Sequence, residues 1–503
     1  MTNTKTSGLS DNELKIGVVF TPIKWGEFAI EKFDIFSKWM NGASVFDPTM
    51  GEGNLLESLI TYGLSKGYNI DELPTQQLFG NELNTVFYNN ARAKFKEKYD
   101  LDITNNFWNV DILKFENNAY DILFGNPPWQ NFVDLPERYK SKIKSDFFKY
   151  DLIGDSQSLL LGGSRIDIAA LIIQKSIKDL LNPKGDAYFF MPLSLLLNDG
   201  ANRHFRTYKI NDTKYAVRKV YDFNNLKIFN GISTRYGLVH FSKDISQTFP
   251  IDFVRYENEC WKKYSAKPIF NLSDPLSILE GEENNLMMNY SPIKIKKEST
   301  PRQGVNTCGA NKLFFFDTYK ELNSKTCIVS NDISLPKEFV YPLLTSKNFK
   351  EKELVPYKWV LLPYSKSGKP LAKQELFEKK ELFNYLTQHE TQLNERKGTL
   401  IGAWFKRGYW WALLGVGPYN FFKYKIVWEA YGKNSFNPML VSGEWQASQS
   451  LQSYIPVKTL DEAKRVLSEL QNPAVETYLL SLKMEGTMNW AQPGKIKKLL
   501  QVE

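Results

Sequence analysis

Three short apolar segments, each ending in a carboxylate, constrain the fold of this chain more than any other feature. They occupy residues 43–47, 77–82 and 107–111. Each has the length of a buried β-strand, and the stretches between them are long enough for helices, so the sequence predicts an open α/β sheet with parallel strands. The carboxyl ends of parallel strands meet at one edge of a sheet. Asp47, Glu82 and Asp111 are therefore expected to line one crevice, although ordinary strand-end capping is the better explanation of any one of them taken singly.

A glycine-containing loop follows the first of these segments. Pro-Thr-Met-Gly-Glu-Gly at residues 48–53 separates it from a helix expected over residues 55–64. Strand, glycine loop and helix form the arrangement with which open α/β sheets hold nucleotides. The loop contains neither Gly-x-Gly-x-x-Gly nor Gly-Lys-Ser/Thr, which disfavours a pyrophosphate ligand. Asp47 beside glycines that admit a close approach suits a zwitterionic or cationic ligand better.

A stiff turn at residues 125–129 follows a further apolar strand at residues 122–124. Asn126 presents a side-chain carbonyl next to the backbone carbonyl of Pro127, and the prolines fix φ and carry no N–H. Two fixed acceptors suit an amino group whose hydrogens are held while its nitrogen reacts, and Trp129 can stack on a flat ring. A proline-rich turn with a core tryptophan explains these four residues equally well when they are considered alone.

Further alternation of helix and strand completes the predicted first domain. An amphipathic helix is expected over residues 24–40 and a buried helix over residues 165–181. Strands are expected over residues 187–192, 219–223 and 234–241. The fold class is therefore α/β, with a seven-stranded Rossmann-like domain over residues 1–245 and a mixed α+β domain over residues 246–503.

The second half of the chain carries all of the net positive charge. Residues 1–250 contain 29 Lys and Arg and 29 Asp and Glu, so the net charge of +8 lies within residues 251–503. Charged, linker-like stretches at residues 280–285 and 294–302 precede a region in which basic and aromatic residues interleave. This pattern is typical of a surface that meets a polyanion, although a β-core with a solvated basic rim is the more frequent explanation of each residue singly. The candidates for nucleic-acid contact are Lys406, Arg407, Trp410 and Lys423.

Several classes of protein are disfavoured by what the sequence lacks. No apolar run approaches the roughly 18 residues of a membrane span, and residues 1–11 do not form a secretory signal. Three cysteines and three histidines without ligand spacing argue against a zinc site or a disulfide framework. No Asp…Glu-x-Lys nuclease pattern is evident, so a fused endonuclease is disfavoured. The prediction is a cytoplasmic protein that binds no metal.

Taken together, these residues resemble the S-adenosylmethionine-dependent amino-methyltransferases of DNA. The order of the motifs is that of the gamma class, which methylates adenine N6 and is frequent in type II restriction-modification systems. The resemblance covers residues 16–245, with two departures: Trp129 stands where Tyr or Phe is more frequent, and residues 66–76 form an insertion. The motifs that carry it are Phe20-Thr-Pro22, Asp47-Pro-Thr-Met-Gly-Glu-Gly53, Glu82, Asp111 and Asn126-Pro-Pro-Trp129.

The resemblance implies S-adenosylmethionine as the cofactor. The segment at residues 20–22 is expected to border its methionine end, Glu82 to bind the ribose hydroxyls, and Asp111 with Ile112 to hold the adenine. The residues implied in cofactor binding are Phe20, Thr21, Pro22, Asp47, Gly51, Gly53, Glu82, Asp111, Ile112 and Asn126.

The same resemblance implies how the target amine is held. Asn126 and Pro127 are expected to accept the hydrogens of the amine, while Trp129 and Phe229 stack on its base. Phe229 is also compatible with a place in the core.

The implied activity is sequence-specific transfer of a methyl group to N6 of a flipped-out adenine in duplex DNA. The basic second domain is then expected to recognise the target sequence, and the partners are double-stranded DNA and a separately encoded endonuclease where the enzyme is restriction-linked. A monomer is compatible with the sequence. Two alternatives stay open: an N-methyltransferase acting on RNA adenine or a protein glutamine, and a DNA-binding modification subunit that needs a partner.

Overall fold

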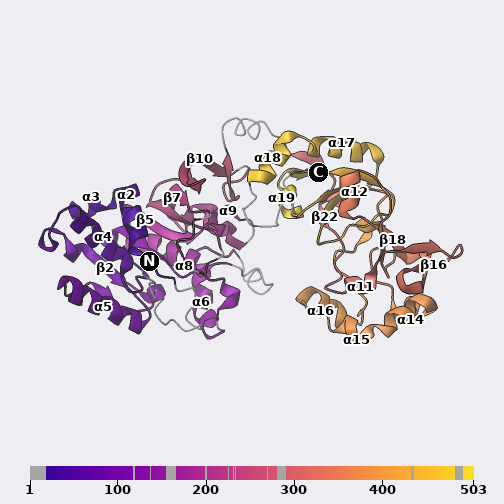
Figure 1. Ribbon diagram of the computed structural model, residues 1–503, viewed down its shortest axis with the longest axis horizontal. Coiled ribbons are helices and arrows are strands. Elements are labelled where there is room, and N and C mark those ends of the chain that lie inside the picture. Colours follow the sequence, from indigo (N-terminus) through magenta and orange to yellow (C-terminus); the bar gives the residue numbers. More distant parts are fainter. Residues whose placement is uncertain are drawn as a thin grey trace. The chain divides into compact units, whose positions relative to one another are not determined.

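The chain forms two compact units, Met1–Gly281 and Glu282–Glu503, each of which is described by itself (Figure 1). The computed structural model describes residues 19–116, 119–135, 137–154, 166–198, 201–224, 226–229, 231–232, 234–268, 270–279, 291–431, 435–481 and 491–503.

The first unit is built around an open sheet whose middle is the predicted seven-stranded arrangement. The order is β3-β2-β1-β4-β5-β8-β7, with β1 to β5 parallel and β8 inserted antiparallel between β5 and β7. Each strand overlaps its predicted segment, which confirms the Rossmann-like α/β fold. The strands are β1 (Val45–Asp47), β2 (Leu78–Asn81), β3 (Phe107–Trp108), β4 (Tyr120–Gly125), β5 (Leu181–Pro192), β7 (Thr213–Asp222) and β8 (Tyr236–Lys243).

The sheet continues past the end of the predicted first domain at residue 245. β9 (Ile251–Glu257) pairs parallel with β7, and β10 (Cys260–Pro268) and β11 (Leu276–Leu279) add antiparallel strands beyond it. A short strand, β6 (Lys209–Ile210), pairs with β7 as well. The boundary of the unit therefore falls at residue 281, because β9 pairs with β7, β10 with β9 and β11 with β10, which keeps all three strands in the sheet.

Helices cover both faces of this sheet. Phe46 and Leu123 point into one core together with α6 and α8, whereas Val45, Ile122 and Phe124 point into the other with α2 to α5. The burial of successive strand residues on both faces explains why these strands are almost uninterruptedly apolar. The helices are α2 (Ile23–Phe33), α3 (Ile35–Met40), α4 (Asn54–Ser65), α5 (Thr85–Tyr99), α6 (Glu137–Lys149), α8 (Ile168–Leu180) and α9 (Ser194–Leu197).

The single helix predicted over residues 24–40 is wrong, because the chain breaks it into α2 and α3. Asp34 adopts the left-handed conformation with φ 53° and ends α2, and its backbone N–H donates to the carbonyl of Ile30. Aspartate tolerates this conformation better than most residues.

A polar cluster joins α3 to the sheet at the face opposite α8. Asp186 accepts hydrogen bonds from Lys38 Nζ (2.7 Å) and from Ser242 Oγ (2.8 Å), and its Oδ1 lies 2.8 Å from His240 Nε2. Burial alone would raise the pKa of the Asp186 carboxyl, but the hydrogen bonds from His240, Lys38 and Ser242 together hold this pKa far below its usual value. The cluster therefore favours the charged carboxylate in the folded protein.

Replacing Asp186 with asparagine is expected to lower the free energy of unfolding at pH 7 by about 1.5–3 kcal/mol, the typical contribution of hydrogen bonds to a charged group. Because the folded-state pKa is depressed, this stabilisation is present above the unfolded-state pKa of about 3.9 and is lost as the pH falls through the folded-state value. Urea unfolding at pH 7 and pH 3.5 should show a large difference between the two proteins at pH 7 and a smaller one at pH 3.5. Asp212→Asn, at an exposed carboxylate of the same unit, is the control and should change neither midpoint. Equal effects of Asp186→Asn at both pH values would contradict this account.

The second unit is a mixed α+β domain, as predicted. Its largest sheet has the order β13-β22-β20-β21, and two three-stranded sheets have the orders β14-β19-β18 and β15-β16-β17. The strands are β12 (Ile293–Ile295), β13 (Arg302–Gln303), β14 (Phe315–Phe316), β15 (Tyr319–Glu321), β16 (Thr326–Val329), β17 (Ile333–Pro336), β18 (Val340–Leu343), β19 (Lys358–Leu361), β20 (Tyr424–Glu429), β21 (Met439–Ser442), β22 (Gln452–Val457) and β23 (Leu500–Val502).

Helices pack at two places in this unit. α17 lies beside β20 to β22, whereas α14 packs against β17 and α15 packs against α14 (Figure 1). The helices are α11 (Asn311–Phe314), α12 (Ser346–Glu351), α13 (Lys373–Glu378), α14 (Lys380–Gln388), α15 (Glu390–Asn394), α16 (Thr399–Phe405), α17 (Leu460–Leu470), α18 (Pro473–Ser481) and α19 (Pro493–Lys497).

The two stretches that the sequence predicted as linkers differ in what the structure shows of them. Residues 294–302 are not a linker, because they contain most of β12 and the start of β13. The stretch predicted at residues 280–285 lies outside the described residues. Over the described ranges, no helix is both long enough and apolar enough to cross a membrane.

Candidate active site

A cavity of about 620 Å³ opens at the carboxyl edge of β1, β2 and β4. The strand ends that the sequence placed at one edge do meet there, because β1 pairs in parallel with both β2 and β4. Eight of the ten residues predicted to bind a cofactor line this cavity: Phe20, Thr21, Asp47, Gly51, Glu82, Asp111, Ile112 and Asn126.

The glycine loop after β1 and the carboxylate after β2 are joined by hydrogen bonds. Glu82 Oε2 accepts from the backbone N–H of Gly51 (2.9 Å), and its Oε1 accepts from that of Asn84 (2.7 Å). Gly51 has φ +56°, and a Cβ built on it would lie 2.5 Å from the ring of Phe20. Glycine is therefore required at this position both for its backbone conformation and for space. Two backbone donors hold the carboxylate in a fixed orientation at the cavity.

Two acidic groups lie close together under this loop. Burial raises the pKa of Asp47 well above its usual value, against the hydrogen bond from the Thr49 N–H and with the support of the nearby Glu82 charge. Burial also raises the pKa of Glu82, although the backbone N–H groups of Asn84 and Gly51 oppose the shift. The floor of the cavity is therefore a buried acidic region, which favours a ligand that carries positive charge or donates hydrogen bonds.

Asp111 and Ile112 line the same cavity. Asp111 Oδ1 accepts from the Leu113 N–H (3.1 Å) and so caps the 3₁₀ turn Ile112–Lys114. The Ile112 side chain is buried. This pair is suited to a flat ring that carries an amino group. The apolar side chain can pack against the ring, and the carboxylate can accept a hydrogen bond from the amino group.

Asn126 has one end anchored and the other without a partner. Its Nδ2 donates to the carbonyl of Val19 (3.0 Å) and to Thr21 Oγ1 (3.1 Å). A carbonyl can only accept, so the Val19 contact fixes which end of the amide is the NH₂ group. Asn126 Oδ1 is buried and has no hydrogen-bond partner among the residues that the structure describes. An acceptor in this condition costs free energy unless a ligand donates to it, so it indicates a binding site.

Three aromatic rings gather behind Asn126. Trp129 meets Phe229 edge to face at 5.1 Å between centroids and lies 5.4 Å from the ring of Tyr236. The Tyr236 hydroxyl accepts from the Ile228 N–H (2.9 Å) and donates to the Leu226 carbonyl (3.0 Å), so it holds the loop that carries Phe229. Trp129 and Phe229 are in direct contact, so a base between them requires the rings to separate. Their stacking on a base stays a prediction.

Five of the residues predicted for binding of the cofactor or the target amine lie outside the lining of the cavity: Trp129 and Phe229, described above, and three others. Pro22 is exposed at the start of α2, Gly53 precedes α4 with φ +76°, and Pro127 is buried beside the site. Pro128 lines the cavity instead.

Sequence reasoning missed one wall of the cavity. α6 forms part of this wall. Its apolar and basic residues follow Trp129 closely in the sequence, and this proximity was the signal from which the wall could have been predicted. The missed lining residues include Asn54, Phe87, Leu135, Tyr139, Lys142 and Ile143.

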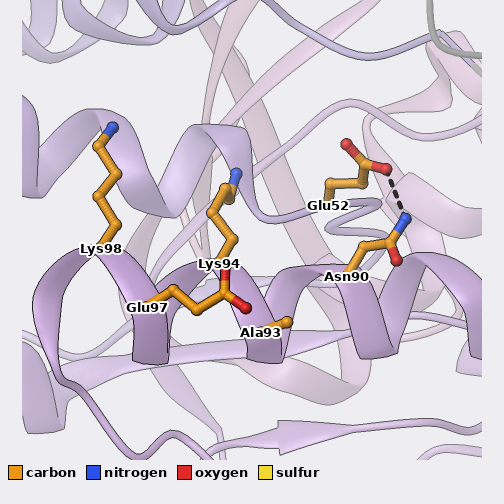
Figure 2. A pocket seen from close by; sticks show the side chains of 6 residues that line it. All are labelled: Glu52, Asn90, Ala93, Lys94, Glu97 and Lys98. Carbon is orange, nitrogen blue, oxygen red and sulfur yellow. Dashed lines mark hydrogen bonds between the residues drawn. The ribbon is translucent and has the colours of Figure 1, made fainter.

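A second hollow of about 620 Å³ lies on the surface of α5 (Figure 2). Its lysines already have partners: Lys94 and Lys98 each lie 2.6 Å from an oxygen of the buried Glu57. Burial would raise the pKa of Glu57, but the hydrogen bonds from these lysines hold it below its usual value. Lys94 also donates to Asn54, which donates to the Thr21 carbonyl. Both lysines of this hollow are therefore paired with Glu57. Lys94 also helps to hold Asn54, which lines the active-site cavity.

The residues predicted to contact nucleic acid are separated within the second unit. Lys406 and Arg407 are exposed after α16, and Lys423 is exposed just before β20. Trp410 packs against the core, and its carbonyl accepts from Arg396 Nη2 (2.6 Å). Contact with nucleic acid stays a prediction for all four. No group of three or more His, Cys, Asp or Glu placed to hold a metal ion occurs among the described residues.

Comparison with known proteins relates the sequence and the fold of this chain to one group of enzymes. Residues 64–229 match the family model described as Eco57I restriction-modification methylase. The type II methyltransferases M.HincII and M.HindII of Haemophilus influenzae are each 24% identical to this chain over 222 residues. That match covers 44% of this chain but only 36% and 35% of the two relatives, so the chain spans about a third of their length.

Two solved structures share the fold over most of the chain. The type IIL restriction-modification enzyme MmeI in complex with DNA matches 93% of this chain and 64% of its own, with TM-score 0.55 and 12% identity. A nuclease-deletion mutant of the type ISP restriction-modification enzyme LlaGI with a DNA substrate mimic matches 96% and 46%, with TM-score 0.51 and 13% identity. In the sequence of its first unit and in its fold, this chain resembles the DNA methyltransferases of restriction-modification systems.

Proposed function

We propose that this chain is a DNA methyltransferase that methylates N6 of adenine in duplex DNA with S-adenosylmethionine as the methyl donor. The observation that carries the proposal is Asn126, whose Oδ1 is buried without a partner while its Nδ2 is anchored to Val19 and Thr21. Such an acceptor is ready to receive a hydrogen from an amine without any rearrangement of its own.

The cavity fits S-adenosylmethionine on the residues that line it. The Gly51 N–H orients the carboxylate of Glu82, which can accept from two ribose hydroxyls. The buried acidic floor at Asp47 suits a molecule with a positively charged centre. When bound, this cofactor supplies an electrophilic methyl group on a sulfonium.

The role of the protein groups is to hold the target amine. Asn126 Oδ1 and the Pro127 carbonyl each accept one hydrogen of the amine, which turns the nitrogen lone pair away from the ring. Positioning and charge stabilisation of this kind need no general base and no covalent intermediate. A single well-placed acceptor pair is therefore sufficient for the chemistry assigned to this chain.

Adenine is preferred to the other amines and amides that such a clamp could hold. The named relatives are type II methyltransferases, and the structural neighbour MmeI is described in complex with DNA. The second unit adds the excess of basic residues that binding to phosphates requires. RNA adenine and protein glutamine are the competing substrates.

The target base must leave the duplex to reach Asn126. Flipping costs a few kcal/mol, and stacking on an aromatic ring offsets about 1–3 kcal/mol per contact. Trp129 and Phe229 are the rings proposed for this stacking. Their present contact implies that entry of the base separates them.

Expression of this chain alone in a host that lacks adenine methylation, followed by mapping of modified bases across the genome, tests the proposed function. We expect N6-methyladenine at one short recurring sequence. Cells carrying Asn126→Ala at equal protein level are the control and should show none. Modified cytosine in place of adenine, or an unmodified genome despite folded protein that binds S-adenosylmethionine, would contradict the proposal.

A further inference from the structure

A basic hollow of about 470 Å³ lies in the second unit, formed by β13, the segment before β20 and α19. It contains two cationic side chains and two glutamine amides, and no acidic residue lines it. The lining residues are Pro301, Arg302, Gln303, Gly415, Tyr419, Gln492, Pro493, Gly494 and Lys497.

Arg302 lies against an aromatic ring in this hollow and, within the described ranges, has no carboxylate partner. Its guanidinium lies 4.5 Å from the centroid of the Tyr419 ring. Its backbone is held by the pairing of β13 with β22, where Arg302 lies opposite Tyr454. Arg302 Nε is buried and makes no hydrogen bond to any described residue. Among the described residues, Arg302 forms no ion pair either.

Other arginines of this unit show what a structural role requires. Arg396 donates to the carbonyls of Leu393 (2.9 Å), Thr307 (3.1 Å) and Trp410 (2.6 Å). Arg465 pairs with Glu469 at 2.7 Å. A guanidinium has five N–H donors, and a buried donor such as Arg302 Nε is costly to leave without a partner. Arg302 therefore has donor capacity that the protein itself does not use.

Lys497 supplies a second positive charge to the hollow. It is exposed at the end of α19 and, within the part of the chain that the structure describes, has no carboxylate within ion-pair distance. The chain leading to α19 is anchored, because Trp428 Nε1 donates to the Ala491 carbonyl (2.6 Å) and Ala491 N–H donates to the Ala430 carbonyl (3.1 Å). Around Gly494 there is open space into which a ligand can extend.

The chemistry of the lining favours an anion over a base. The ring of Tyr419 is covered on one side by Arg302, so it does not offer that face to a nucleobase. A planar guanidinium that is already oriented by an aromatic ring, with an ammonium nearby, matches the oxygens of a phosphate. Gln303 Nε2 already donates to the Tyr431 hydroxyl, so the two cationic side chains are the groups that would hold the anion.

We propose that this hollow binds a backbone phosphate of duplex DNA through Arg302 and Lys497. The inference rests on the proposed function, since it presumes that DNA is the substrate, and it adds a contact site apart from Lys406, Arg407, Trp410 and Lys423. The contact positions the duplex and does not read its sequence.

The test is binding of a fluorescein-labelled duplex of mixed sequence, measured by anisotropy over a series of salt concentrations. The variants are Arg302→Gln and Lys497→Gln, and Arg465→Gln is the matched control because it removes one positive charge from the same unit. A lost phosphate contact is expected to weaken binding about 3- to 10-fold at 0.1 M salt and to reduce the slope of log K against log salt by about 0.9. The control should leave both quantities unchanged. Thermal melting of each variant shows whether it is folded.

The outcomes separate this inference from the proposed function. If the wild-type chain fails to bind duplex DNA, the proposed function fails. If it binds, and folded Arg302→Gln and Lys497→Gln keep the wild-type salt slope, the phosphate site is wrong while the function stands. Relaxed sequence choice by Arg302→Gln with an unchanged slope would also overturn the inference, because it would make Arg302 a reader of bases.

Discussion

Asn126→Ala is expected to slow methyl transfer to duplex DNA by at least about 10²–10³-fold, the usual effect of removing one preorganised hydrogen-bonding group from an active site. The loss follows from removal of the buried Oδ1, the only side-chain acceptor that the site offers to the target amine in this account. Binding of S-adenosylmethionine and of DNA should change little. Single-turnover transfer of labelled methyl groups measures the rate, and calorimetry and anisotropy measure the two affinities.

Thr21→Val is the matched control for this prediction. It removes one of the two acceptors that anchor Asn126 Nδ2 but leaves the Val19 carbonyl and Asn126 Oδ1 in place. The rate should fall much less than in Asn126→Ala. An Asn126→Ala protein that keeps more than a tenth of the wild-type rate would show that Oδ1 does not hold the amine.

Glu82→Ala is expected to weaken binding of S-adenosylmethionine about 10- to 100-fold. The estimate corresponds to loss of charge-assisted hydrogen bonds of about 1.5–3 kcal/mol. The variant also frees the backbone N–H groups of Gly51 and Asn84, which Glu82 now engages. Because burial raises the pKa of Glu82, the affinity of the wild-type protein should start to fall at a higher pH than an exposed glutamate would produce.

Calorimetric titration with S-adenosylmethionine tests this second prediction. Glu52→Ala is a suitable control, because Glu52 is a neighbouring glutamate that bonds Asn90 outside the active-site cavity. It should leave the affinity unchanged. An unchanged affinity in Glu82→Ala would remove Glu82 from the cofactor site.

The parts of the site that could be predicted from sequence are those that local rules determine. Asp47, Glu82 and Asp111 each follow a short apolar strand, and parallel strands bring their ends to one edge. Gly51 was identifiable because a left-handed turn beneath a ligand requires glycine. These features depend only on residues close together in the chain.

The parts that escaped prediction depend on contacts between distant segments. The wall formed by α6 could not be assigned, because its sequence does not say which face meets a cavity built by β1 and β2. The extension of the sheet by β9 to β11 depends on pairing with β7 across the whole first unit. The break at Asp34 depends on a single backbone conformation in an otherwise helical pattern.

The second unit shows the same limit for charged and aromatic residues. Composition indicated a basic surface but could not show that Trp410 is partly buried against the core, or that Arg302 lies on a strand where the sequence predicted a linker. Whether a cation is paired is decided by neighbours far away in the sequence, as the contrast between Arg396 and Arg302 shows.

Analysis of the labelled nucleosides is the most direct test of the central claim. The purified chain is incubated with methyl-labelled S-adenosylmethionine and duplex DNA of mixed sequence, and the DNA is digested and separated. The account predicts that the label appears in N6-methyldeoxyadenosine and that it is absent when Asn126→Ala replaces the wild-type protein. Label in a cytosine derivative, or label in RNA or protein but not in DNA, would contradict it.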